Sequence, residues 1–132
     1  MDESKVLFRA KRLNSKEWVY GYYIGNVGDG CYEICDISSS LGTRVDVDPT
    51  TLGQYVDRED EKRFKIFTGD ICIFYTSTED IGVIKHKGKV IFKDSKFMFY
   101  SDCYYDLAEA FNICVIGNVT DNPELDMEGY VL

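Results

Sequence analysis

The sequence predicts a mainly β protein, built as a small antiparallel barrel or sandwich. Tyr and Phe, which favour strands, number 10 and 8, whereas only 2 residues are Pro. About eight or nine short apolar or alternating segments follow one another, separated by turn residues at intervals of roughly 8–12 residues. The chain has 132 residues, enough for one domain with a buried core. We therefore expect short paired strands around that core.

Four strands are expected in the first 55 residues. They cover residues 6–12, 17–25, 31–37 and 43–48. The first two are expected to form an antiparallel hairpin, an Asp-Gly turn at 27–30 precedes the third, and a small-residue loop at 38–42 precedes the fourth. Asp48-Pro49 then predicts a helical turn ended by Gly53, because Asp caps early N–H groups and Pro fits the first helical position.

Strands also dominate the expected structure of the remaining chain. They cover 64–67, 70–77, 81–86, 89–93, 96–101 and 113–119. Lys87-Gly88 is expected to be the turn of a hairpin. The run 57–63 contains no Gly and no apolar residue, which predicts a solvated, mobile loop.

Two helical segments are expected near the C-terminus. Residues 104–111 predict a helix because their apolar side chains recur at helical spacing, with Asp102 to cap it and Asn112 to end it. Asn122-Pro123 predicts one last helical turn before the acidic tail 126–132.

The charge balance restricts the classes of partner. There are 15 Lys and Arg against 23 Asp and Glu, a net charge of -8, which disfavours binding to nucleic acid in bulk or to anionic membranes. No signal peptide and no apolar segment of membrane-spanning length is evident, so we expect a cytoplasmic protein, in the cytosol of a host cell. The five cysteines cannot all pair, and we expect them to be buried free thiols. No cofactor and no metal is expected.

Four motifs together resemble the YopX family of phage and prophage proteins. They are Phe8-Arg9-Ala10 with 18–24, then 47–55, 66–71 and 115–125. The resemblance implies one YopX-like domain over 1–132, with an N-terminal strand layer at 1–55 and a Src-homology-3-like barrel at 64–125. It also implies homo-oligomers and transfers no catalytic residues. The run 57–63 departs from the family pattern, as does Phe67-Thr68, where the family usually has Tyr-Glu.

The motif residues are interpreted as fold determinants. They are Trp18, Gly21, Asp48, Pro49, Gly53, Gln54, Tyr55, Gly69, Asp70, Gly117, Asn118, Asn122 and Pro123. Gly53 and Gly69 suit positive φ after a turn, and Asp70 can accept backbone N–H bonds. Trp18 is expected to anchor the core rather than to contact a ligand.

Catalytic chemistry has little support in the sequence. His86, the only histidine, lies among lysines that disfavour its protonation, and it is expected at the surface near a turn. Asp46 and Asp48 share one face of a strand, and with Asp70 they define a hypothetical metal-assisted hydrolase. Phosphate-binding glycine loops are absent from the sequence.

The segment 85–96 carries five lysines among aromatic residues. The candidate binding residues are Lys85, Lys87, Lys89, Lys93, Lys96, Phe97 and Phe99, with Phe92 and Tyr100 nearby. One interpretation is stacking and phosphate contacts with single-stranded nucleic acid. The favoured alternative is that lysines protect a strand edge while the aromatics face inward. A third is that the segment meets the acidic surface of another subunit.

Three functional hypotheses follow. The leading one is a non-enzymatic phage or prophage accessory protein that self-assembles and binds another protein. The alternative is a nucleic-acid-binding β-barrel that uses the segment 85–96. The third is the metal-assisted hydrolase.

Overall fold

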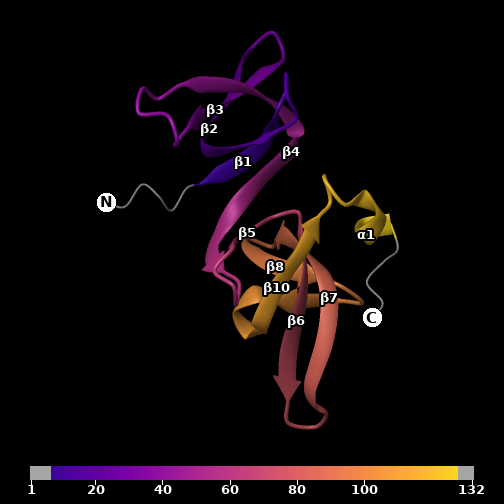
Figure 1. Cartoon of the computed structure of the whole chain (residues 1–132). Helices are drawn as coiled ribbons and strands as arrows, with labels where there is room; N and C mark the ends of the chain where they lie inside the picture. The colour runs from indigo at the N-terminus through magenta and orange to yellow at the C-terminus, as the bar shows by residue number, and fades with distance from the viewer. Residues whose placement is uncertain (1–6, 128–132) are drawn as a thin grey trace. The chain divides into compact units, whose positions relative to one another are not determined.

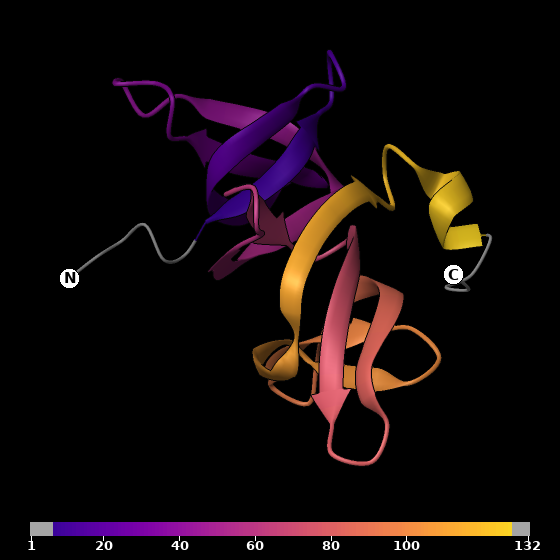
Figure 2. The same cartoon turned by 60° about the horizontal axis from the view of Figure 1, so that its bottom comes forward.

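The computed structural model describes residues 7–127, and these form two antiparallel sheets and one short α-helix (Figures 1 and 2). The strands are β1 (Phe8–Arg12), β2 (Trp18–Gly28), β3 (Cys31–Asp36), β4 (Arg44–Glu59), β5 (Lys65–Phe67), β6 (Asp70–Thr78), β7 (Gly82–Lys93), β8 (Lys96–Tyr100), β9 (Tyr104–Asp106) and β10 (Phe111–Asn118). A 3₁₀ turn η2 (Leu107–Glu109) precedes β10, and α1 (Pro123–Met127) follows it. The chain divides into two compact units, one ending at Tyr55 and the other starting at Val56. The mainly β class is confirmed, whereas the five-stranded sheet of the second unit, where the barrel was predicted, does not close.

The first unit is built on strands β1 to β4. β1 pairs with β2 on one side and with β4 on the other, and β3 also pairs with both β2 and β4. Alternate residues point to a small apolar core, whose fully buried members are Ala10, Val19, Ile34 and Val47. Gly21 of β2 must be Gly, because a Cβ there would collide with the backbone carbonyl of Cys35.

The predicted helical turn at Asp48-Pro49 is wrong, because β4 runs through it as one long strand (Figure 1). Asp48 does accept the N–H of Thr50, at 3.0 Å, but within extended backbone. The pairing of β1 with β4 jumps from Lys11–Asp48 to Arg9–Gly53, and this irregularity accommodates a proline that cannot donate to the ladder. Gly53 therefore lies inside a strand instead of ending a helix.

The second unit contains a five-stranded sheet in the order β10-β6-β7-β8-β9. Its inward side chains pack into a larger core, in which Phe74 and Phe99 stack with ring centroids 4.0 Å apart. Figure 2 shows β6 and β7 as a long hairpin. At its other end, Gly69 has the expected positive φ of 91°, and the buried Asp70 carboxylate accepts the N–H of Phe67 at 2.8 Å.

The predicted hairpin at Lys87-Gly88 is wrong, because β7 continues through it. A Cβ on Gly88 would lie 2.8 Å from the carbonyl oxygen of Tyr100 and 2.9 Å from the ring of Phe74, so the glycine allows close packing inside the sheet. The turn comes later, at Asp94-Ser95, where φ is 52° and 66°. Positive φ at both central residues matches the twist of a tight hairpin.

The predicted helix over 104–111 is also wrong. Tyr104–Asp106 forms β9 on the edge of the sheet, only Leu107–Glu109 is helical as a 3₁₀ turn, and Phe111 already belongs to β10. The capping residue is Asp106, whose carboxylate accepts the N–H of Ala108 at 3.1 Å. Pairing with β8 outweighs the helical spacing of the apolar residues.

The charged run 57–63 is an ordered part of the second unit, not the predicted mobile loop. Asp60 is only 6% exposed, and its carboxylate accepts three backbone N–H groups, at 2.9 to 3.0 Å, from Lys62, Phe64 and Val115. The Arg58 guanidinium donates to the carbonyl oxygens of Leu107 and Ala110 at 2.6 and 2.8 Å. These charges cap backbone groups that would otherwise be buried without partners.

The C-terminal motif folds as predicted. The side-chain oxygen of Asn122 accepts the N–H of Asn118 at 3.2 Å, and Pro123 starts α1. Gly117 leaves room for Asn122, whose oxygen would lie 2.6 Å from a Cβ at that position. The end of the acidic tail lies outside the described residues. In the first unit, Gln54 pairs with Phe8, and the N–H of Tyr55 donates to the carbonyl oxygen of Leu7 at 2.8 Å.

Candidate interaction surfaces

The outer side of β2 carries a row of exposed large side chains, which we call the aromatic face. It consists of Trp18, Tyr20, Tyr22 and Ile24. These residues alternate with core-facing neighbours such as Val19, as the period of a strand requires. Tyr20, Tyr22 and Ile24 are 38%, 37% and 41% exposed, and Trp18 is half-buried. The prediction of Trp18 as a core anchor is therefore wrong, because its even position places it opposite the core.

Two cations of β1 lie against the indole of Trp18. The guanidinium carbon of Arg9 is 4.5 Å and the ammonium nitrogen of Lys11 is 4.6 Å from the ring centroid. Cation–π contacts of this kind hold an aromatic ring in one orientation. The aromatic face thus begins with a positioned Trp rather than with a mobile one.

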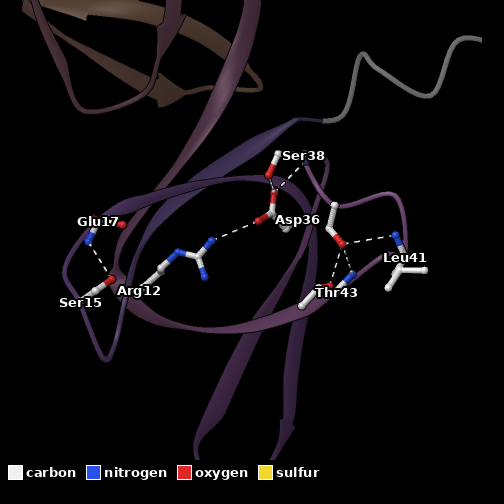
Figure 3. Close-up of polar contacts among 8 residues, drawn as sticks. Arg12, Ser15, Glu17, Asp36, Ser38, Leu41 and Thr43 are labelled. Carbon is white, nitrogen blue, oxygen red and sulfur yellow. Dashed lines mark hydrogen bonds and ion pairs between the residues drawn. The ribbon is translucent and has the colours of Figure 1, made fainter.

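Next to β3, a polar cluster fixes the loop 37–43 of the first unit (Figure 3). The Asp36 carboxylate accepts the N–H and the hydroxyl of Ser38, at 2.8 and 2.7 Å, and pairs with the Arg12 guanidinium at 3.1 Å. The bonds from Ser38, followed by the charge of Arg12, lower the pKa of Asp36 below its ordinary value of 3.8. The partners of the carboxylate come from the loop and from β1 and join the two, so this cluster is a structural one.

A second surface belongs to the second unit, and we call it the lysine face. It consists of Lys85, Lys87, Lys89, Lys93, Lys96, Tyr100 and Tyr104. The four lysines of β7 occupy alternate positions, while His86, Gly88 and Val90 between them are buried. The register pairs Lys93 with Lys96, Lys89 with Tyr100 and Tyr100 with Tyr104, which places all seven residues on one side of the sheet.

Phe97 and Phe99 lie on the opposite side of the sheet from the lysines. Phe99 is fully buried in the core and Phe97 packs against it, so the aromatics proposed for binding are core residues. Phe92 pairs with Phe97, with ring centroids 5.2 Å apart. The tyrosines of the lysine face, Tyr100 and Tyr104, take the place of the predicted phenylalanines. Alternation continued across the turn at Asp94-Ser95 places Tyr100 on the same side as the lysines. Tyr104 could not be placed there from the sequence, because a helix was predicted for its segment.

Three of the five lysines have acidic partners. The side-chain pairs are Lys89 with Asp126 at 3.2 Å, Lys93 with Asp94 at 4.0 Å and Lys96 with Asp106 at 2.9 Å. The bond to Asp106 raises the pKa of Lys96, and the same bond lowers the pKa of Asp106. Within residues 7–127, no ion pair is found for Lys85 or Lys87.

His86 is buried behind the lysine face, which corrects the prediction of a surface histidine. Its side chain is stacked on Phe74 and close to Tyr105, with ring centroids 4.9 and 4.3 Å apart, and its Nε2 lies 2.8 Å from the hydroxyl of Thr76. Burial lowers the pKa of His86, and the charge of Asp102 opposes that effect. A neutral histidine inside an aromatic stack is a core residue.

Tyr105, Asp102 and Cys103 form a small polar group beside His86. The hydroxyl of Tyr105 donates to the Asp102 carboxylate at 2.9 Å. A bond with the Cys103 side chain, followed by burial, raises the pKa of Tyr105, so its phenol stays protonated. The same phenol lowers the pKa of Asp102. No group of three or more metal-ligating side chains occurs among residues 7–127.

The residues of the metal hypothesis have separate structural tasks. In the first unit, Asp46 pairs in register with Glu33, and the Asp48 carboxylate accepts the N–H of Thr50. In the second unit, the Asp70 carboxylate accepts the N–H of Phe67. None of the five cysteines forms a disulfide. Cys72 is buried as expected, whereas Cys103 is exposed. In the described part of the chain, no helix has the length and apolar character of a membrane span.

Comparison with known proteins identifies one family. No curated protein and no solved structure matches the chain significantly. Residues 7–126, nearly the whole chain, match the family described as YopX protein. The predicted resemblance is thereby confirmed, and the chain belongs to the YopX protein family.

Proposed function

We propose that the protein is a non-enzymatic phage or prophage accessory protein that self-assembles and binds other proteins in the cytosol of its host. The observation that carries this proposal is the aromatic face of β2. Membership of the YopX family supports it, because the family resemblance implies homo-oligomers and no catalytic residues. The finer assignment of the second unit to the Src-homology-3-like type is part of the proposal, supported by its five antiparallel strands.

The residue types of the aromatic face favour protein recognition. Trp and Tyr are enriched among the side chains that contribute most to protein–protein affinity, and Trp18, Tyr20 and Tyr22 supply both types. Rigid aromatic side chains on a strand lose little conformational entropy when they are covered. A second copy of the chain can present the same face, which is the arrangement of an isologous dimer.

The experiment is light scattering coupled to size exclusion at micromolar concentration. The wild-type chain is expected to elute as an oligomer, and Tyr22→Thr with Ile24→Thr is expected to shift it towards the monomer. Thr keeps the strand propensity while it removes the apolar area. The matched control is Ile81→Thr with Val83→Thr, which removes two side chains that are 74% and 63% exposed at the β6–β7 hairpin.

The control variant is expected to keep the wild-type mass. A monomeric wild-type chain, or equal dissociation of both variants, would contradict the assignment of self-assembly to the aromatic face. Circular dichroism of each variant shows that the strands are retained.

A further inference from the structure

We infer that the lysine face of the second unit binds single-stranded nucleic acid, with the five lysines on the phosphates and Tyr100 and Tyr104 on the bases. This goes beyond the proposed function, because it assigns a different ligand to a different surface.

Alternation gathers the charges into one line. Lys85, Lys87 and Lys89 follow one another at every second position of β7, about 6.8 Å apart in an extended strand. Their buried neighbours fix the direction of the strand, so the three ammonium groups cannot rotate to the other side of the sheet. Lys93 continues the line to the end of β7, and Lys96 pairs with it across the turn at Asp94-Ser95. The result is a basic track along which a polyanion can lie.

The charges of this track are available to phosphates. Lys85 and Lys87 have no ion pair in the part of the chain that the structure describes. The partners of the other three are surface carboxylates, and ion pairs near the surface contribute little to stability. A phosphate can therefore replace a carboxylate at small cost, whereas the net charge of -8 limits only the long-range attraction.

The tyrosines supply flat surfaces beside the track. Tyr100 and Tyr104 are 39% and 47% exposed, and their ring centroids lie 5.2 Å apart. The ammonium nitrogen of Lys93 is 4.9 Å from the centroid of Tyr104, so charge and ring lie together. Stacking on such rings tolerates any base, since each base has a π face. Tracks that combine cations with exposed rings are typical of proteins that bind single strands.

The residue types favour nucleic acid over a protein partner. Lys is depleted in protein–protein interfaces, where Arg, Trp and Tyr are enriched. The lysine face contains five Lys and neither Arg nor Trp, whereas the aromatic face of the first unit contains Trp18 and no Lys. An acidic polypeptide, including the acidic surface of a second copy, is therefore the competing occupant that the experiment has to exclude.

The experiment is fluorescence anisotropy with labelled oligothymidine of about 12 nucleotides, titrated with the full chain over a series of salt concentrations. Binding in the micromolar range at low salt is expected, weakening as salt increases. Lys85→Gln with Lys87→Gln is expected to weaken binding at least about tenfold and to reduce the log–log salt slope by about 1.4, since each single-strand phosphate contact contributes about 0.7.

The matched control is Lys16→Gln with Lys62→Gln, which changes the net charge equally at exposed lysines outside the face. It is expected to bind like the wild type. Tyr104→Leu tests stacking independently, with an expected loss of at least about fivefold and an unchanged salt slope.

Three results would overturn the inference. The first is the absence of salt-sensitive binding by the wild-type chain. The second is an equal loss of affinity in the two double-lysine variants, which would show that the change in net charge alone causes the effect. The third is competition by polyglutamate as strong per charge as by unlabelled oligothymidine, which would assign the face to acidic polypeptides.

Discussion

The aromatic face and the lysine face use the same strand geometry for opposite chemistries. In β2 the outward positions carry Trp and Tyr, whereas in β7 they carry Lys, and in both strands the inward positions fill a core. Because successive side chains of a strand point to opposite sides, alternate residues can serve recognition on one side and the core on the other. One small chain can thus present two surfaces of different chemistry.

The two units also differ in how their surfaces are supported. The fully buried core of the first unit consists of four small or medium aliphatic residues, and cation–π contacts position Trp18 above it. The second unit has a larger aromatic core and uses the buried charges of Arg58 and Asp60 to cap its backbone. Substitutions in the core of the second unit, or of Arg58 or Asp60, should therefore disturb the lysine face and leave the aromatic face intact.

The largest expected effect is that of Gly88→Val. A Cβ at this position meets the carbonyl of Tyr100 and the ring of Phe74, so we expect the second unit to lose about 3 kcal/mol of unfolding free energy. Urea unfolding is followed by alkylation of the buried Cys72 for the second unit and by the fluorescence of Trp18, the single Trp, for the first. The outward variant Lys85→Val should change stability by less than about 0.5 kcal/mol.

Asp60→Ala is expected to have the next largest effect. It leaves the N–H groups of Lys62, Phe64 and Val115 without their acceptor, which should cost about 2 kcal/mol. In this variant the second unit should open more readily, so that Cys72 becomes more reactive and oligothymidine binding weakens. Self-assembly should persist. If Asp60→Ala were as stable as the wild type, the run 57–63 would be the solvated loop that its composition suggests.

A smaller effect is expected from pH. Burial holds the pKa of His86 below its ordinary value of 6.5, so below pH 6.5 the unfolded chain binds more protons than the folded one. Stability should therefore be constant above pH 6.5 and fall as the pH decreases towards the folded pKa. His86→Gln should remove this pH dependence of the stability of the second unit, as followed by alkylation of Cys72. Asp36, whose pKa is lowered from 3.8, should affect stability only in more acidic solution. An unchanged slope in His86→Gln would assign the titration to another group.

The smallest expected effect is a gain. Asp106→Asn removes the negative partner of Lys96 but keeps an oxygen that can accept the N–H of Ala108. Because an exposed ion pair is weak, oligothymidine affinity should rise only about two- to fivefold. Glu79→Gln, in the β6–β7 turn outside the face, is the control for net charge. A loss of affinity in Asp106→Asn would show that Lys96 does not contact phosphate.

The sequence predicted strands well where alternation and turn chemistry agree. The hairpin of β1 and β2, the Gly69-Asp70 turn and the start of α1 at Pro123 belong to this group. It failed where one residue type has two physical uses. Gly88 has the residue type of a turn, but in this protein it allows close approach within a sheet. Asp48-Pro49 is typical of a helix start, but an irregular strand pairing accommodates the proline.

Long-range partners explain the remaining errors. The segment 104–111 has helical spacing, but pairing with β8 across the sheet decides its structure. The sequence predicts that the charges of Arg58 and Asp60 are solvated, because their backbone partners, such as Val115, lie far away in the sequence and give no local signal. The lysines of the candidate site were found from composition alone, whereas the choice between Phe97 and Tyr104 required the register.

The central claim is that the two faces bind different partners. It is tested most directly by sedimentation velocity of the chain mixed with labelled oligothymidine, because one run reports both assembly mass and nucleic-acid binding. We predict that Tyr22→Thr with Ile24→Thr lowers the mass and leaves each chain able to bind the oligonucleotide. Lys85→Gln with Lys87→Gln should do the reverse. Loss of both properties in either variant, in chains that remain folded, would contradict the account.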